Sequence, residues 1–230
     1  MSIVEVSNLS KNYYQYKVFA RGKILTKALQ NVSFKVKEGD FFGVLGKNGA
    51  GKSTLLRILT TNLNKTNGKV YIDGLDLDKE QKKIKDYISW MFGVDYEGIG
   101  WSSVEKNLTL AAYFLGLDKI KTEKRVKELI EFFDLNKVKK LDVWRLSSGM
   151  KSKYSLAVAM LKEPRILFLD EPLLGLDVPS KDALREMLKL INKEGVTIFY
   201  TDHQLNEMER VCKNVVIINE GKLAYQGGVE

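Results

Sequence analysis

The sequence contains little cysteine, histidine or proline: Cys212 and His203 are single occurrences, and three prolines occur among 230 residues. A lone cysteine forms no internal disulfide and is typical of a reducing compartment. The longest apolar run, 108–117, falls well short of the roughly 18 residues that a membrane-spanning helix needs. The first ten residues lack the basic start and the long apolar stretch of a secretory signal. We therefore expect a soluble, cytoplasmic protein.

Neither disorder nor a strongly one-sided charge is indicated by the composition. Hydrophobic residues make up 44% and charged residues 29% of the chain, which is close to the globular average. The net charge of +8 would suit a nucleic acid, an anionic membrane surface or a phosphorylated ligand. The densest basic stretches, 79–85 and 119–127, also contain acidic and apolar residues, as solvated helices do. We therefore expect no specific nucleic-acid partner.

Apolar periodicity predicts strands and helices in alternation. Period-two patterns and short continuous apolar runs indicate strands at 3–6, 32–36, 41–45, 69–72, 87–92, 166–169, 196–200 and 215–218. Helices are expected at 53–61, 104–115, 123–133, 137–141, 148–161 and 179–195, with a short one before the last strand. The residues from Lys11 to Gln30 are expected to form a long polar connection. Apolar strands alternating with helices predict an α/β fold with a mainly parallel sheet covered on both faces.

A glycine-rich segment between the predicted strand 41–45 and the predicted helix 53–61 carries the strongest functional signal. The phosphate-binding loop pattern is matched by Gly46, Lys47, Asn48, Gly49, Ala50, Gly51, Lys52 and Ser53. Backbone N–H groups of such a loop, and the N-terminus of the helix after it, bind phosphate oxygens. Lys52 is expected to reach the β- and γ-phosphates of a nucleotide, and the Ser53 hydroxyl to ligate Mg²⁺. Thr54 completes the predicted nucleotide-binding set.

A pair of carboxylates follows the apolar strand 166–169. We expect Asp170 to hold Mg²⁺ at the carboxyl end of that strand, where α/β sheets bind ligands. Glu171 is then placed to polarise the water that attacks the γ-phosphate. Carboxylates commonly end strands, so the pair gains its meaning from the phosphate-binding loop upstream.

Together with these motifs, the segment Leu146, Ser147, Ser148, Gly149 and Met150 resembles the signature motif of the ATP-binding domain of ABC transporters. The likeness covers nearly the whole chain. It implies a P-loop NTPase core with a mainly parallel sheet, an N-terminal antiparallel β subdomain and a helical subdomain. It also implies a single ATP-binding domain over 1–230, with the ATPase core in 1–95 and 147–230 and the helical subdomain in 96–146.

The signature segment has a physical role that fits this resemblance. A serine and a glycine that open a helix make a second phosphate-binding N-terminus. Two such helices serve one ATP only when the second comes from another chain, so the resemblance implies an ATP-dependent homodimer or an equivalent pair of ATPase subunits. A serine that simply caps a helix is the alternative interpretation.

Three further positions resemble the family. The segment Gly175 to Asp177 resembles the D-loop, which crosses the dimer interface, although a turn and helix cap would also explain it. His203 follows a predicted strand and resembles the switch histidine that contacts the γ-phosphate, so the catalytic candidates are Glu171 and His203. Tyr13 resembles the aromatic residue that stacks on adenine.

The sequence departs from the family after the predicted strand 87–92. The family has a glutamine there, which contacts magnesium and water, and the start of the next helix at Val104 places that position on Val94. Valine neither ligates a metal nor orients water. We hypothesise that the neighbouring Asp95 makes the metal-side contact instead. The alternative is that the register of this position is displaced, although no glutamine lies between Gln81 and Gln204.

The stretch Gly98 to Trp101 combines glycines with apolar residues, on a loop at the start of the predicted helical insertion. It is suited to docking a helix of a partner protein, and in the family this region faces the transmembrane subunit. The alternative is that Trp101 anchors the core of the helical insertion.

The resemblance thus implies the ATP-hydrolysing subunit of an ABC transporter, which binds ATP and Mg²⁺ and drives a separate transmembrane permease from the cytoplasmic face of the membrane. Gly175 to Val178 and Met150 look most like the exporter branch. One alternative is a soluble ABC-type ATPase that acts on nucleic acid or ribosomes, although such relatives usually carry two ATPase domains or a coiled-coil insertion. A nucleotide-binding regulator without turnover is disfavoured by Glu171 and His203.

Overall fold

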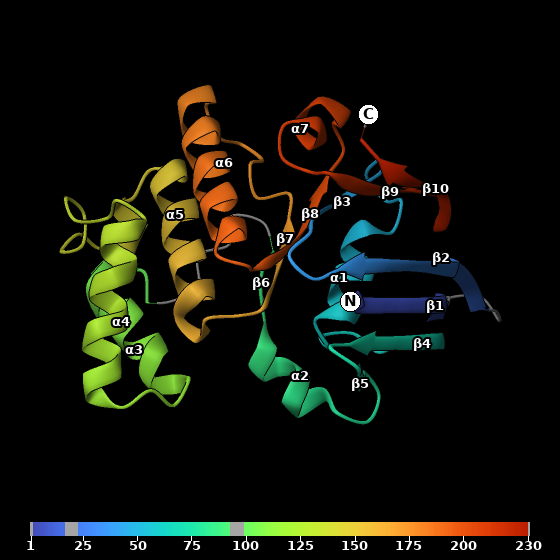
Figure 1. Cartoon of the computed structure of the whole chain (residues 1–230), viewed down its shortest axis with the longest axis horizontal. Helices are drawn as coiled ribbons and strands as arrows, with labels where there is room; N and C mark the ends of the chain where they lie inside the picture. The colour runs from blue at the N-terminus through green and yellow to red at the C-terminus, as the bar shows by residue number, and fades with distance from the viewer. Residues whose placement is uncertain (1, 17–22, 93–98, 230) are drawn as a thin grey trace.

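The computed structural model describes residues 2–16, 23–92 and 99–229. Figure 1 shows two sheets with most of the helices gathered to one side. A four-stranded antiparallel sheet has the order β2-β1-β4-β5 and consists of β1 (Ser2–Tyr16), β2 (Lys23–Lys37), β4 (Asn67–Ile72) and β5 (Leu75–Asp76). It forms the antiparallel β part that the sequence resemblance implied.

The second sheet has six strands in the order β10-β9-β3-β8-β7-β6. Its strands are β3 (Phe41–Leu45), β6 (Ile88–Phe92), β7 (Ile166–Asp170), β8 (Thr197–Asp202), β9 (Asn214–Asn219) and β10 (Lys222–Gly228). All neighbouring pairs are parallel except β9 and β10. The predicted mainly parallel α/β sheet is therefore confirmed.

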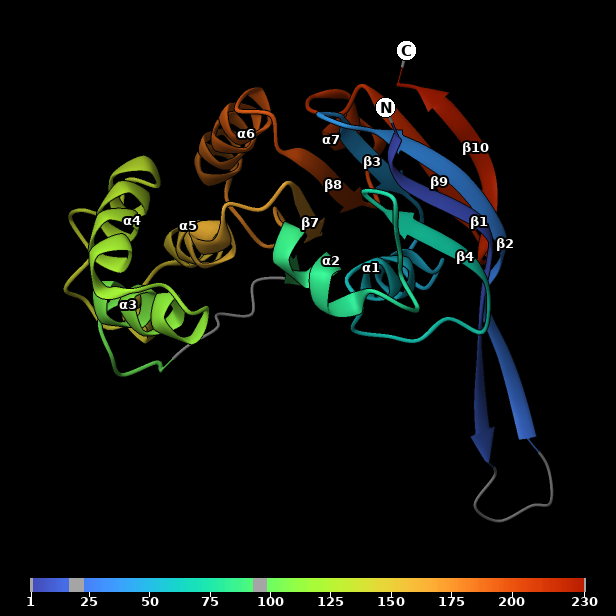
Figure 2. The same ribbon diagram turned by 60° about the horizontal axis from the view of Figure 1, so that its bottom comes forward.

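The helices lie on both faces of the six-stranded sheet. They are α1 (Lys52–Leu59), α2 (Gln81–Tyr87), α3 (Val104–Phe114), α4 (Lys119–Phe132), α5 (Ser148–Ala159), α6 (Val178–Lys193) and α7 (Leu205–Glu209), with 3₁₀ turns at Val143–Arg145 and Met160–Lys162. Both views place α1 between the two sheets and α5 and α6 beyond the opposite face (Figures 1 and 2). No helix in the described part of the chain is both long and apolar enough to cross a membrane.

The buried strand β7 shows why the sequence builds two cores. Successive side chains of a strand point to opposite faces of the sheet. Ile166 and Phe168 therefore pack with α1 and the antiparallel sheet, whereas Leu167 and Leu169 pack with α3 to α7. A strand that is buried on both faces has no polar positions, which explains its unbroken apolar sequence.

The prediction of a long polar connection from Lys11 to Gln30 is wrong. Strand β1 continues to Tyr16 and pairs with β2 from Lys23 onward, with Tyr13 opposite Thr26. Figure 2 shows this outer part of the hairpin projecting from the body of the protein. Tyr14 and Leu25, which pair on the hairpin, are both exposed, so this part of the two strands lacks the apolar-in, polar-out alternation that marks a half-buried strand.

Two further differences concern short segments. The predicted helix at 137–141 is a series of turns, which is expected because so few residues cannot repay the cost of starting a helix. Strand β10 was not predicted, since Lys222–Gly228 carries mostly exposed side chains and two glycines. It is held in the sheet by antiparallel pairing with β9.

Candidate functional site

The glycine-rich loop joins β3 to α1, as predicted. Gly51 stands immediately before α1 with a φ of 113°, a backbone conformation that residues with a Cβ rarely adopt. A Cβ on Gly51 would lie 2.6 Å from the carbonyl oxygen of Ala28 on β2. The loop therefore needs glycine there for its conformation and for its contact with the antiparallel sheet.

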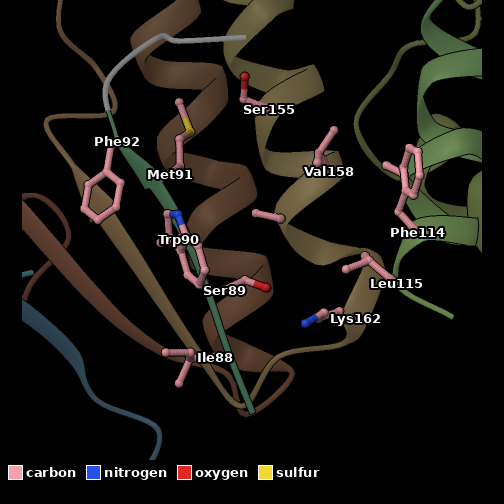
Figure 3. Close-up of a pocket in the computed structure, with 12 residues that line it drawn as sticks. Ile88, Ser89, Trp90, Met91, Phe92, Phe114, Leu115, Ser155, Val158 and Lys162 are labelled. Carbon is pink, nitrogen blue, oxygen red and sulfur yellow. The ribbon is translucent and has the colours of Figure 1, made fainter. Parts of the chain in front are cut away.

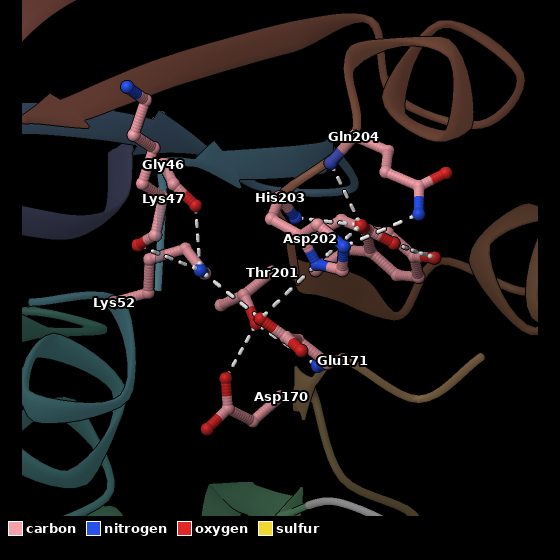
Figure 4. Close-up of polar contacts among 10 residues, drawn as sticks. Gly46, Lys47, Lys52, Asp170, Glu171, Thr201, Asp202, His203 and Gln204 are labelled. Carbon is pink, nitrogen blue, oxygen red and sulfur yellow. Dashed lines mark hydrogen bonds and ion pairs between the residues drawn. The ribbon is translucent and has the colours of Figure 1, made fainter. Parts of the chain in front are cut away.

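Lys52 is buried beneath this loop, and its ammonium is turned back toward the loop. Its Nζ donates to the carbonyl oxygen of Gly46 at 2.7 Å and lies 3.1 Å from Oε1 of Glu171. Figure 4 shows Glu171 between Lys52 and His203. A cation and a carboxylate from two distant segments thus meet at the end of the loop.

Thr201 on β8 organises the two carboxylates at the end of β7. Its Oγ1 donates to Oδ1 of Asp170 at 2.6 Å and accepts from the backbone N–H of Glu171 at 3.0 Å. Glu171 has a φ of 49°, which costs a residue other than glycine about 1–2 kcal/mol. Such strain persists only where neighbouring contacts hold it, and it is concentrated at functional sites.

Asp202 fixes the turn that carries His203. Its Oδ1 accepts from the backbone N–H groups of His203 at 2.7 Å and Gln204 at 3.0 Å, and its Oδ2 accepts from the Tyr200 hydroxyl at 3.2 Å. Nδ1 of His203 lies 3.7 Å from Oε1 of Glu171. The same carboxylate oxygen of Glu171 therefore faces both Lys52 and His203.

A cavity of about 690 Å³ opens beside these residues. The predicted residues that line it are Tyr13, Asn48, Gly49, Gly51, Lys52, Ser53, Thr54, Asp170 and Glu171. It is also lined by residues that were not predicted, namely Thr26, Lys27, Ala28, Gln30, Glu220 and Gly221. The latter come from the first half of β2, which was expected to be part of a connection, and from the turn that leads from β9 into the unpredicted strand β10.

The signature segment lies apart from this cavity, at the start of α5. The Ser147 hydroxyl accepts from the backbone N–H of Met150 at 3.3 Å, so Ser147 is a helix cap. Leu146 and Gly149 are buried, whereas Ser148 is exposed. A Cβ on Gly149 would lie 2.5 Å from Oγ of Ser180, so this glycine allows α5 to approach the first turn of α6.

Asp177 likewise caps a helix, at the start of α6. Its Oδ1 accepts from the backbone N–H of Ser180 at 2.9 Å. Hydrogen bonds from the Ser180 side chain and backbone lower the pKa of the Asp177 carboxyl. The capping interpretation is confirmed for Asp177, which is not among the residues that line the cavity.

The remaining predictions concern the segment between β6 and α3. Val94, Asp95 and Gly98 lie outside the described residues. Trp101 is 83% exposed, so the alternative that it anchors the core is wrong. Its loop is held by a hydrogen bond from the backbone N–H of Trp144 to the carbonyl oxygen of Gly100.

Comparison with known sequences identifies relatives along most of the chain. The family model described as ABC transporter matches residues 29–174. The ABC transporter ATP-binding protein NatA of Bacillus subtilis is 31% identical over 212 residues, which cover 92% of this chain and 86% of NatA. The methionine import ATP-binding protein MetN 1 of Bacillus cereus is 32% identical over 233 residues, covering 99% of this chain but 65% of MetN 1. The chain thus spans slightly less than two thirds of that longer relative.

Two solved structures share the fold. One is the dimeric post-hydrolysis state of the ATP-binding cassette MJ0796 bound to ADP and Pi, with a TM-score of 0.85 and 25% identity over 99% of each chain. The other is cbiO1 from Clostridium perfringens, part of the ABC transporter complex cbiONQ, with a TM-score of 0.85 and 27% identity over 99% of this chain and 89% of cbiO1. The phosphate-binding loop, the fold and these relatives agree, and the chain therefore belongs to the ABC transporter family as an ATP-binding ATPase domain.

Proposed function

We propose that this chain hydrolyses ATP with its phosphates held by the loop Gly46–Thr54 and with Glu171 and His203 at the γ-phosphate. The observation that carries the proposal is the meeting of Lys52, Glu171 and His203 at one carboxylate oxygen. Glu171 polarises the attacking water and His203 contacts the γ-phosphate. Lys52, which is buried and charged, holds the β- and γ-phosphate oxygens.

The donor set also suits Mg²⁺. Ser53 and Asp170 line the same cavity, and a hydroxyl with a carboxylate is the kind of hard oxygen pair that this ion prefers. Bound Mg²⁺ would neutralise charge on the phosphates. We propose that Ser53 and Asp170 hold it, with Thr201 orienting Asp170 through its hydrogen bond.

Tyr13 is placed to bind the base. It lies on the β1–β2 hairpin at the cavity, and the Lys11 ammonium lies 5.0 Å from the centroid of its ring. An aromatic ring near the cavity offers a stacking surface for adenine. We propose this role for Tyr13.

The complete site requires a second chain. Residues 146–150 do not line the cavity of their own chain, and α5 lies across the sheet from α1 (Figure 2). In the proposed head-to-tail dimer, each ATP lies between the loop of one chain and the start of α5 of the other. The dimeric state of MJ0796 bound to ADP and Pi supports this arrangement, in which ATP favours the closed dimer.

A surface substitution at the start of α5 tests the dimer. Ser148 is exposed, so Ser148→Arg preserves the fold while its long side chain blocks the phosphates of a second chain. We expect the variant to bind ATP as a monomer, to lose the ATP-dependent dimer on size-exclusion chromatography and to lose phosphate release. A variant that dimerises and releases phosphate normally would contradict the shared site.

We further propose that a separate membrane permease binds the helical side of the molecule, at the cytoplasmic face of the membrane. A groove of about 440 Å³ runs between β6, α3 and α5. Figure 3 shows Trp90, Leu115 and Val158 along this groove, with Phe114 at its side. Phe114, like Trp101, is 83% exposed. Such an apolar groove with exposed aromatic residues fits an amphipathic helix.

We also propose a division of the chain into two parts. Residues 1–95 and 147–230 belong to the ATPase core and 96–146 to the helical subdomain, and the proposed permease groove lies where β6 and α5 of the core meet α3 of the subdomain.

The direction of transport that we propose is export. The exporter-like segment Gly175–Val178 supports export, whereas MetN 1 is named as an import protein. In inside-out membrane vesicles, an exporter accumulates its substrate after ATP is added, and mass spectrometry of the vesicle contents would reveal it. Depletion instead would indicate import.

A further inference from the structure

A buried ion pair joins the two helices that follow Asp177 and His203. Arg185 on α6 is 5% exposed and Glu207 on α7 is 8% exposed. Nε and Nη2 of Arg185 both donate to Oε2 of Glu207, at 3.1 and 2.8 Å. Nη1 of Arg185 also donates to Asp182, one turn earlier on α6.

Arg185 lies on the face of α6 that is otherwise apolar, between the buried Leu184 and Leu188. Burial alone would lower the pKa of its guanidinium, but the hydrogen bond and attraction of Glu207, with a contribution from Asp182, outweigh burial and raise that pKa. A buried ion pair of this kind is commonly no more stable than an apolar pair of similar volume. Its position is therefore better explained by the geometry that it imposes than by a gain in stability.

Helix α7 depends on such contacts for its placement. It has five residues, Leu205–Glu209, and Gln204 before it provides no side-chain cap. So short a helix does not persist without tertiary contacts. Two side chains hold it: Met208 is fully buried against β3, where it approaches Gly43, and Glu207 binds Arg185.

The negative charge of Glu207 acts on Tyr200, whose hydroxyl binds the carboxylate that fixes the His203 turn. Burial, together with the charges of Asp202 and Glu207, raises the pKa of the Tyr200 hydroxyl. That hydroxyl donates to Asp202, which in turn accepts from the backbone N–H of His203. Arg185 thus supplies positive charge to a buried cluster whose hydrogen bonds set the position of His203.

We propose that Arg185 is a positioning residue, which holds Glu207 with two donors and thereby fixes α7 and the approach of His203 to Glu171. Because Asp177 caps α6 and Arg185 lies about two turns after it, the pair also ties the His203 segment to the helix that Asp177 caps. The inference rests on the proposed catalytic role of His203. In this account Arg185, on α6, aligns the imidazole of His203, which precedes α7.

The test replaces the pair without leaving a buried charge. In Arg185→Met with Glu207→Leu, two apolar side chains fill the space, so the melting temperature should be retained. We expect kcat for phosphate release to fall about tenfold, as misplacement of a catalytic group does, with KM for ATP within about twofold. Arg185→Lys keeps the charge but replaces the two-donor geometry by one point charge, and it should lower kcat by a smaller factor with the fold intact.

A double-mutant cycle with His203→Ala separates positioning from a general structural effect. If Arg185 acts through His203, the apolar pair should lower kcat no further when His203 is absent, because contributions of coupled residues do not add. An equal fall of kcat in both backgrounds would overturn the inference, as would a full kcat in the apolar pair or in Arg185→Lys. An unchanged kcat in His203→Ala alone would instead refute the proposed role of His203.

Discussion

The Lys52 ammonium lies 3.1 Å from Oε1 of Glu171, across the end of the phosphate-binding loop. The lysine that is proposed to hold the β- and γ-phosphates is thus paired with the carboxylate that is proposed to activate water. In the proposed mechanism, phosphate oxygens of ATP would compete with Glu171 for this ammonium. Lys52 would then pair with the nucleotide instead of the carboxylate, which would leave Glu171 free to act as a base.

Replacing Glu171 by glutamine should separate binding from hydrolysis. Glu171→Gln removes the base and the negative charge that competes for Lys52, so we expect phosphate release to fall by about a hundredfold or more while ATP binds more tightly. Calorimetric titration with ATP and a phosphate-release assay measure the two effects. Glu194→Gln, an exposed carboxylate at the end of α6, is the matched control. Comparable turnover in Glu171→Gln and the control would contradict the assignment.

Asp177 should be both a helix cap and a contributor to turnover. Asp177→Asn keeps a side-chain oxygen that accepts from the Ser180 N–H, so its melting temperature should match that of the unmutated protein. Its kcat should nevertheless fall, because the charge at the proposed dimer interface is lost. Asp177→Ala should lower both quantities. If Asp177→Asn retains the full kcat, capping is the whole role of this residue.

Trp101 and Phe114 should be needed for the permease and not for the isolated ATPase domain. Trp101→Ala and Phe114→Ala are expected to reduce the amount of permease that co-purifies with the chain, since each removes an exposed aromatic side chain. ATP turnover of the isolated chain should not change. Ile120 on α4 is 80% exposed, and Ile120→Ala provides a control of similar exposure. Equal losses in all three variants would contradict a localised contact.

Cys212 should be unreactive in the folded protein. Burial, followed by the nearby charge of Asp202, raises the pKa of this thiol above its ordinary value of 9.0. The reactive thiolate is therefore scarce in the folded state at about pH 8, and denaturation should release it. Above the ordinary pKa, the unfolded chain loses a proton that the folded chain retains, so stability should decline as pH rises. Rapid modification by a disulfide reagent without denaturant would contradict this account.

The segments that meet in the candidate site could be predicted from sequence because their pattern depends on local spacing. The glycines and Lys52 occur within eight residues, and Asp170 and Glu171 directly follow a continuous apolar strand. The hairpin formed by β1 and β2 gave no such signal, because Tyr14 and Leu25, which pair on its described strands, are exposed. Strand β10 was missed for the same reason, since pairing with β9 rather than its own apolar pattern places it in the sheet.

Thr201, Asp202 and the pair of Arg185 and Glu207 were not predictable. Their residue types are common, and their roles arise from contacts between segments that are distant in sequence. Thr201 meets Asp170 from the neighbouring strand, and Arg185 meets Glu207 from another helix. Only the packing of β7 against β8 and of α6 against α7 creates these relationships.

The most direct test of the transporter role is purification of the tagged chain from detergent-solubilised membranes, with identification of the proteins that co-elute. The account predicts a membrane protein with several spanning helices, in a fixed ratio to the chain. Recovery of ribosomal or nucleic-acid components without a membrane protein would contradict it and would favour a soluble ATPase.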